Sequence, residues 1–255
     1  MRGKPALFVI SSKIRARIRF SAEVRMTVVD KLKNLSEQSL AEFMARLVPT
    51  LPRERVAGVR VPAIRRLAKS LDDAEREDFL NALPHFYLEE NILHSVLVSG
   101  MKDFDATVEA VREFLPHIDN WAVCDALSPR SFARADVRDR VRELAFGWLA
   151  SERVYTARFG ANCMRSFMLG EGFDKSVADA VARVGGEYYL DMGAAWFFCE
   201  AIVKRPDEVL PYFEEGRLSV EVHRLAVKKC VESFRVTSEL KEHLRALPLP
   251  ERTGE

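Results

Sequence analysis

The stretch FDATVEAVREFLPHIDNWAVCD, from Phe104 to Asp125, decides the fold class of this chain. Its first part repeats large apolar residues at spacings of four, three and four positions, namely Phe104, Val108, Val111 and Leu115. This is the period of an α-helix that buries one face and exposes the other. Pro116 follows directly and ends such a helix. The stretch therefore predicts an amphipathic helix over 104–115, then a turn into a second, short helical segment.

The same pattern continues on both sides of this stretch. Helix-capping Ser and Asp residues, and Pro or Gly at the joints, divide the chain into about a dozen helical segments. The expected helices cover residues 36–48, 62–69, 73–83, 89–99, 104–115, 136–150, 154–169, 173–184, 190–204, 206–215, 218–234 and 237–246. No strand pattern of similar quality follows residue 30. Helices of this length with short joints predict an all-α fold, a HEAT-like helical-repeat solenoid (an α-α superhelix) whose concave face forms a groove.

The N-terminal segment differs from the rest of the chain. Residues 13–20 alternate basic and apolar side chains at a period of two. Such a segment is compatible with a short strand, a basic arm, or an upstream extension of the reading frame with Met26 as the natural start. We therefore expect an N-terminal arm or extension at 1–26, a single HEAT-like domain at 27–247 and a C-terminal tail at 248–255.

Composition limits the possible functions without choosing one. The chain has 255 residues, enough for a core without disulfides or metal. Its 39 Lys and Arg residues balance 38 Asp and Glu residues, so a nucleic-acid partner would have to be bound by a local basic surface. Its four cysteines and five histidines are scattered, without CxxC or HExxH spacing. This pattern favours reduced thiols, and we expect neither a metal ion nor an organic cofactor.

The sequence also lacks a membrane-targeting pattern. No apolar run approaches the roughly 18 residues of a membrane span. The apolar run at residues 6–10 is too short for the core of a signal peptide. We therefore expect a cytoplasmic protein.

Trp121 and Asp125 are the first candidate site residues. They are four positions apart, so on a helix they project from the same face. A flat π surface beside a fixed negative charge suits a cationic or electron-poor group. Taken alone, however, such a tryptophan is more often a core residue, and such an aspartate is more often a capping or solvated acid.

Three further features can each be interpreted as part of a binding site or as an ordinary structural feature. Arg158 lies near the start of a helix, where it could bind a ligand or pair with a neighbouring acid. Trp196 is flanked by small residues that would admit a ligand, but it could equally belong to the core. Arg224, Lys228 and Lys229 form a basic cluster on a late helix, which could be a solvated face. Spacing alone leaves the function open.

Four motifs in a fixed order carry a family resemblance. They are Gly58-Val59-Arg60-Val61-Pro62-x-x-Arg65-Arg66-Leu67, Trp121-x-x-x-Asp125, Tyr155-x-x-Arg158, and Ala195-Trp196 followed by Lys204-x-Pro206-x-x-Val209. Their order and their separations, over about residues 36–246, resemble those of the DNA alkylation repair enzymes of the AlkD-like group. The chain departs from that pattern at Cys199, where a basic residue is expected, and in lacking a tyrosine in the early helix.

The resemblance implies a function and a set of roles. Members are HEAT-like solenoids and monofunctional DNA glycosylases, which hydrolyse the N-glycosidic bond of N3- and N7-alkylated purines such as 3-methyladenine and 7-methylguanine in duplex DNA. It makes Asp125 the catalytic carboxylate, with Trp121 and Trp196 as aromatic walls at the deoxyribose of the lesion. Arg158 would hold the DNA backbone there. Members do not extrude the lesion into a deep pocket, unlike most glycosylases.

Binding is expected to use phosphates and not base edges. The basic residues expected on the concave, DNA-binding face are Arg65, Arg66, Lys69, Arg158, Arg224 and Lys228. The expected partner is double-stranded DNA containing alkylated bases, bound by a monomer that associates with the nucleoid. The alternative is a non-catalytic HEAT-repeat module that binds nucleic acid structures or a protein partner. A metal-dependent hydrolase is disfavoured because no ligand cluster is present.

Overall fold

The computed structural model describes residues 26–250, and every regular element in that range is a helix. The α-helices are α2 (Val28–Lys33), α3 (Gln38–Leu47), α4 (Val61–Ser70), α5 (Asp73–Asn81), α6 (Leu88–Ser99), α7 (Phe104–Phe114), α8 (Trp121–Ala126), α9 (Arg138–Leu149), α10 (Val154–Cys163), α11 (Lys175–Ala182), α12 (Tyr188–Lys204), α13 (Pro206–Glu214), α14 (Val220–Glu232) and α15 (Ser238–Ala246). The predicted all-α fold is confirmed. The basic-apolar segment at 13–20 lies outside the described residues.

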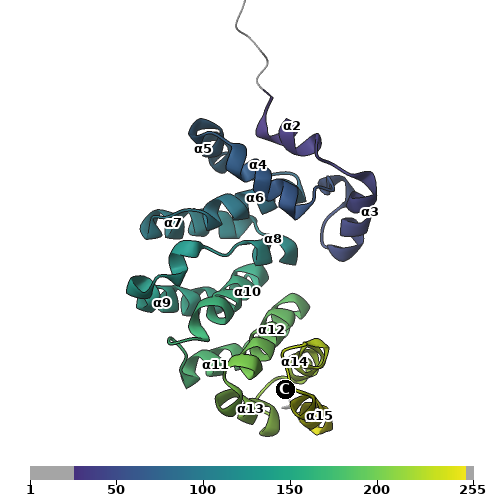
Figure 1. Cartoon of the computed structure of the whole chain (residues 1–255), viewed down its shortest axis with the longest axis vertical. Helices are drawn as coiled ribbons and strands as arrows, with labels where there is room; N and C mark the ends of the chain where they lie inside the picture. The colour runs from purple at the N-terminus through teal and green to yellow at the C-terminus, as the bar shows by residue number, and fades with distance from the viewer. Residues whose placement is uncertain (1–25, 251–255) are drawn as a thin grey trace, which may run out of the picture.

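The helices form a solenoid with two rows. Figure 1 shows them stacked along the long axis, from α2 and α3 at one end to α13, α14 and α15 at the other. In one row α4, α6, α8, α10, α12 and α14 each contact the next. In the other, α9 contacts α11 and α11 contacts α13, while α5 and α7 pack against α6. This is the arrangement of stacked helical hairpins that the helix lengths and short joints predict.

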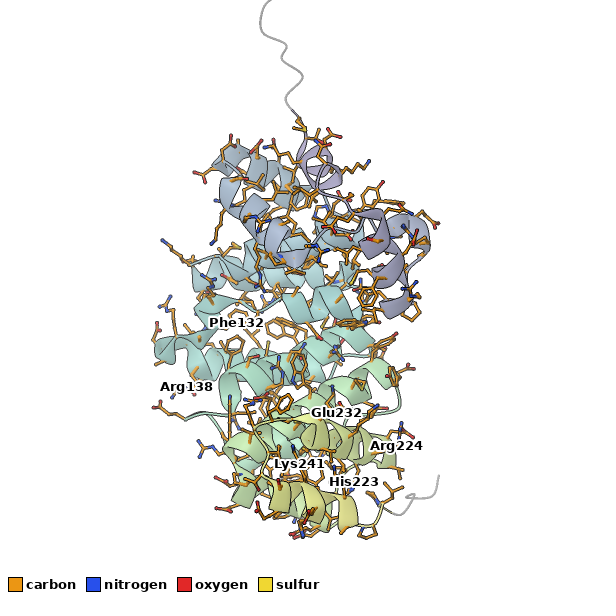
Figure 2. The ribbon with its side chains drawn as sticks, turned by 45° about the vertical axis from the view of Figure 1, so that its right-hand side comes forward. Phe132, Arg138, His223, Arg224, Glu232 and Lys241 are labelled. Carbon is orange, nitrogen blue, oxygen red and sulfur yellow. The ribbon has the colours of Figure 1, made fainter. Side chains whose placement is uncertain are left out.

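Aromatic side chains fill the interior between the two rows of helices. Phe132, labelled inside the stack in Figure 2, is 1% exposed and stacks on Trp148 at a centroid distance of 6.0 Å. Trp148 also lies 5.0 Å from the ring of Phe159 on α10. Gly160 permits close contact there, because a Cβ atom at this position would lie 2.4 Å from the backbone nitrogen of Leu149. Trp148 is thus a core residue, unlike the other two tryptophans of the chain.

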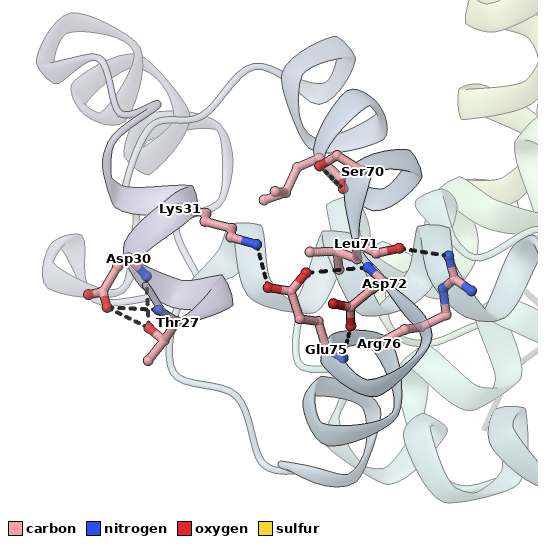
Figure 3. A network of polar contacts seen from close by, with 9 residues as sticks. Thr27, Asp30, Lys31, Ser70, Leu71, Asp72, Glu75 and Arg76 are labelled. Atoms are coloured by element: carbon pink, nitrogen blue, oxygen red, sulfur yellow. Dashed lines mark hydrogen bonds and ion pairs between the residues drawn. The ribbon is translucent and has the colours of Figure 1, made fainter. Parts of the chain in front are cut away.

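The first helix of the structure was not expected from the sequence pattern, which placed the first helix at residue 36. Helix α2 has only six residues, too few to show a helical period. Thr27 and Asp30 close a capping box at its start. Lys31 on α2 forms an ion pair of 2.5 Å with Glu75 on α5, and Figure 3 shows this contact beside the α5 cap. Local capping, the Lys31–Glu75 ion pair and the burial of Val28 and Leu32 against α4 and α6 therefore define α2.

The loop that leads into α4 is held by a buried carboxylate. Glu89 on α6 is 2% exposed and accepts hydrogen bonds from the backbone N–H groups of Ala57 and Gly58 at 2.9 and 2.7 Å. Gly58 has a φ of +82°, and a Cβ atom there would lie 2.5 Å from the carbonyl oxygen of Glu37. Pro62 occupies the first turn of α4, as expected. The first of the four sequence motifs is therefore, in large part, a structural turn.

The predicted helix at 154–169 exists but is not regular throughout. It consists of α10 followed by η5, a π-helix over Met164–Met168. Single π-helical turns often occur at functional sites, because they redirect the side chains that follow. Arg165 lies in this turn.

Candidate functional site

Helix α8 positions the first two site residues. Its N-cap is Asn120, whose fully buried side chain accepts a hydrogen bond from the backbone N–H of Val123 at 3.0 Å. The helix therefore begins at Trp121 and is long enough to include Asp125. The two residues are one turn apart on a single helix, as the spacing predicts.

Asp125 is bound by two side chains of α10. Its Oδ1 and Oδ2 accept hydrogen bonds from Nε and Nη2 of Arg158 at 2.9 and 2.7 Å, a bidentate ion pair. Oδ1 also accepts a hydrogen bond from Nδ2 of Asn162 at 2.8 Å. The side chain of Asp125 is 15% exposed, against 6% for Arg158. The carboxylate is thus fixed in orientation, yet part of it reaches the surface.

Arg158 is itself held between helices. Its Nη1 donates a hydrogen bond to the backbone carbonyl of Tyr189 on α12. A Cβ atom at Gly193 would lie 3.2 Å from Cγ of Arg158, so the glycine makes room for this side chain. Burial disfavours the charged guanidinium, but the hydrogen bonds and the charge of Asp125 outweigh burial and raise the pKa of Arg158. Arg158 is therefore a charged anchor for Asp125.

Trp121 is fixed by its indole nitrogen. Nε1 donates a hydrogen bond of 3.0 Å to the carbonyl oxygen of Leu47, the last residue of α3. The side chain is partly buried against the core. Trp121 thus ties α8 to α3 and still has exposed surface, which the core residue Trp148 largely lacks.

Trp196 is also partly exposed, and two cations lie over its ring. Cζ of Arg165 is 3.8 Å from the ring centroid, and Nζ of Lys229 is 5.9 Å from it. Lys229 belongs to the basic cluster noted in the sequence, but the DNA contacts predicted from that cluster were Arg224 and Lys228. Helix phase explains the difference, since a shift of one residue rotates a side chain by about 100°.

The remaining predicted phosphate contacts lie at the surface. Arg65, Arg66 and Lys69 are exposed on α4, and no ion pair involves them within residues 26–250. Arg224 is exposed at the edge of the molecule in Figure 2 and pairs with Glu221 at 2.7 Å. Lys228 is exposed on the same helix. Whether these residues and Arg158 contact DNA stays a prediction.

Two residues of the site, Asn162 and Arg165, were missed in the sequence, and Lys229 was noted only as a member of the basic cluster. Asn162 is four positions after Arg158, so the same one-turn spacing that singled out Trp121 and Asp125 would have found it. Spacing could not place Arg165 or Lys229 beside Trp196, because their position there depends on how α12 and α14 pack.

Three other features can be stated for the described part of the chain. No group of three or more His, Cys, Asp or Glu side chains there is arranged to hold a metal ion. Within the same range, no helix is both long and apolar enough to cross a membrane. All four cysteines are buried and free.

Comparison with known proteins supports the family resemblance over the first part of the chain, which excludes the fourth motif and Trp196. The model of the family described as DNA alkylation repair enzyme matches residues 28–183, which include Trp121, Asp125 and Arg158. No curated protein matches the chain in sequence. The matched region exceeds half of the 255 residues and runs from α2 to the end of α11. The chain belongs to the DNA alkylation repair enzyme family.

Proposed function

We propose that this protein is a monofunctional DNA glycosylase that removes N3- and N7-alkylated purines from duplex DNA, by hydrolysis of the N-glycosidic bond and without a cofactor. The observation that supports this most directly is the carboxylate of Asp125. It is held by Arg158 and Asn162, keeps an exposed edge, and shares a six-residue helix with the partly exposed Trp121. Membership of the repair family supplies DNA as the substrate.

The chemistry requires little beyond a fixed anion. An N3- or N7-alkylated purine already carries positive charge, so the base leaves readily and oxocarbenium character develops on the deoxyribose. A preorganised carboxylate stabilises that cation, and it can orient the attacking water. A contribution of about 3 kcal/mol to the transition state corresponds to a rate gain of roughly a hundredfold. That gain suits a lesion whose glycosidic bond is already labile.

The neighbouring residues then have distinct roles. Trp121 presents an indole face to the sugar of the lesion, and the ring of Trp196, over which Arg165 and Lys229 lie, forms the second aromatic wall beside it. Arg158 keeps Asp125 in one orientation through two parallel hydrogen bonds. Arg65 and Lys69 on α4 offer exposed positive charge for phosphates. A chain with a formal charge of +1 binds duplex DNA in this way, because the charge is local and not global.

One observation favours a second candidate, a non-catalytic helical module that binds nucleic acid or protein. Asp125 and Arg158 satisfy one another in a largely buried ion pair, which a purely structural role would also explain. In that case the tryptophans would only complete the packing between helices, and substitution of Asp125 would alter stability and not chemistry.

A base-release assay distinguishes the two candidates. Methylated duplex DNA is incubated with the wild type and with Asp125→Ala, and the free bases are separated by chromatography. The glycosylase proposal predicts release of 7-methylguanine and 3-methyladenine by the wild type, and strongly reduced release by the variant. Equal release by both proteins, above the spontaneous rate, would contradict the role of Asp125. No release by a folded wild-type protein that binds the DNA would support the non-catalytic module.

A further inference from the structure

Two cations beside Trp196 lack a partner of opposite charge. Arg165 and Lys229 both lie over the indole ring, and no ion pair involves either of them within the described range 26–250. Nε of Arg165 is buried and has no hydrogen-bond partner there. Arginines on the surface of this protein commonly pair instead, as Arg138 does with Glu171 and Arg224 with Glu221.

Three acids act on these cations, and two of them are held by other arginines, whereas Glu232, three positions after Lys229 on α14, raises the pKa of Lys229. Asp125 is held by Arg158 in a bidentate ion pair, and Glu200 on α12 is held by Arg235. The surroundings of Trp196 therefore carry an excess of positive charge. Burial disfavours the charged guanidinium and lowers the pKa of Arg165, although Asp125 and Glu200 oppose this effect. Burial, followed by repulsion from Arg158, likewise lowers the pKa of Lys229.

Two partly buried cations without an ion-pair partner raise the free energy of the folded protein when no ligand is bound. A partly desolvated cation without a counter-charge loses hydration that the indole face replaces only in part. An anion that binds there restores the missing charge pairing. A cationic ligand, by contrast, would meet two like charges over the same ring. The two cations over the indole ring therefore favour an anionic ligand that lies against an aromatic surface. A DNA phosphate next to a deoxyribose is such a ligand.

The two cations reach this place from different elements. Arg165 is seven positions after Arg158, about two helical turns, so both side chains face α12. Arg158 lies against Gly193, and Arg165 lies over Trp196, three residues further along α12. Lys229 approaches the same indole from α14. Three successive elements of the row thus converge on one ring.

We propose that Arg165 and Lys229 form a phosphate clamp beside Trp196, which holds the DNA backbone next to the nucleotide whose sugar lies at Asp125. This inference rests on the proposed function, because it is the lesion-bearing strand that brings a phosphate to this ring. Arg165 binds the phosphate oxygens through its planar guanidinium, and Lys229 acts as a point charge on the same backbone. The clamp fixes the register of the strand and reads no sequence.

The test is the salt dependence of binding to duplex DNA. Each phosphate contact contributes about 0.9 to the slope of log K against log salt concentration. Arg165→Gln and Lys229→Gln are each expected to reduce the slope by about 0.9, and the double variant by about 1.8. Lys175→Gln serves as the matched control, because Lys175 is an exposed residue at the start of α11, away from Trp196, and its slope is expected to equal that of the wild type. Equal slopes for the wild type and both clamp variants, or an equal fall in the control, would overturn the proposal.

Two further measurements make the result unambiguous. Circular dichroism melting shows whether each variant folds, and Arg165→Lys keeps the charge and is expected to retain the wild-type slope. Base release is measured on the same samples. Release by the wild type with unchanged slopes in the clamp variants contradicts the clamp and leaves the glycosylase proposal intact. No release by the wild type, with slopes that fall as expected, contradicts the glycosylase proposal and supports the clamp.

Discussion

Asp125 carries a bidentate ion pair and a third hydrogen bond, all from α10. A buried ion pair of this kind contributes little net stability, because the desolvation of both charges offsets their attraction. Its effect is on orientation: the carboxylate cannot rotate while Arg158 and Asn162 hold it. At the scale of single residues, the site is therefore a preorganised anion with one partner that sets its position.

Removal of that partner is expected to affect both stability and rate. Arg158→Gln leaves Asp125 largely buried without its counter-charge, and should lower the free energy of unfolding by roughly 3 kcal/mol. Urea denaturation measures this change, and single-turnover base release is expected to slow because the carboxylate is no longer fixed. Arg138→Gln is the control, since the Arg138–Glu171 pair is largely exposed and should contribute less than about 1 kcal/mol. Equal losses in the two variants would contradict the anchoring role.

At this scale the sequence predicts which residues lie one helical turn apart, but it does not predict which side chains on different helices pair. Trp121 and Asp125 could be placed on one turn because helix geometry fixes four-residue neighbours. The pairing of Asp125 with Arg158 could not be derived, because the two residues are 33 positions apart and meet only when α8 docks on α10. The same holds for Lys229, whose contact with Trp196 depends on the rotation of α14 about its axis.

At the scale of elements, the joint before α4 is tightly constrained. Gly58 combines a φ of +82° with close contact to α3 and its N-cap residue, since a Cβ atom would lie 2.6 Å from the backbone nitrogen of Ala41. Its N–H group is held by Glu89 on α6. This joint orients α4, the helix that carries the exposed Arg65, Arg66 and Lys69.

Gly58→Ala is therefore expected to be strongly destabilising. The left-handed backbone costs a residue with a Cβ atom about 1 kcal/mol, and the clash with α3 adds to this. Thermal unfolding should show a midpoint lower by several degrees, roughly 4 °C for each kcal/mol. Gly170→Ala is the control, because nothing lies within 4 Å of a Cβ atom there and the backbone is not left-handed. A midpoint that is equal in both variants would contradict the proposed constraint.

Element boundaries could be predicted wherever a Pro, a Gly or a capping residue marks them. Pro62 and Asp72 mark the starts of α4 and α5 in this way. The predictions failed where no local signal exists. Helix α2 is too short to show a period, and no residue pattern marks the π-helical turn at Met164–Met168. The contact of Arg165 with Trp196 could not be identified from the sequence, because it depends on how this turn packs against α12.

At the scale of the whole molecule, a buried histidine pair links three helices near the N-terminal end. Nε2 of His85 and Nδ1 of His94 are 3.0 Å apart, and both rings are buried. His85 stacks on Phe79 of α5, and His94 stacks on Phe114 of α7. Burial lowers the pKa of His85 to about 4, with repulsion from His117 as a smaller cause. Burial lowers the pKa of His94 to about 3.

The pair predicts a loss of stability in mild acid. Between pH 6.5 and about 4 the unfolded chain binds protons that folded His85 and His94 do not, so the free energy of unfolding is greatest above pH 6.5 and falls as the pH decreases. The slope is up to about 1.4 kcal/mol per pH unit for each imidazole. Denaturation at pH 7.0, 6.0 and 5.0 measures it, above the range in which carboxylates titrate. A His85→Leu, His94→Leu double variant should lose most of this slope, and an unchanged slope would contradict the assignment.

The fold class of the whole chain could be predicted, because the helical period and the short joints recur throughout it. Spacing and composition alone do not predict which side chains share the row from α4 to α14, although the family resemblance assigned Asp125, Arg158 and Trp196 to one site. That row brings these three residues into one region from helices far apart in the sequence. The proposed function depends on this convergence, since no single helix carries the carboxylate, its anchor and both indoles.

The most direct test of the account is the single-turnover rate of 7-methylguanine release from a duplex with one lesion, measured for the wild type and for Asp125→Asn, with DNA affinity measured in parallel. The account predicts that both proteins bind the duplex with similar affinity and that the variant releases the base about a hundredfold more slowly. Equal affinity with no release of 7-methylguanine by the wild type would contradict it.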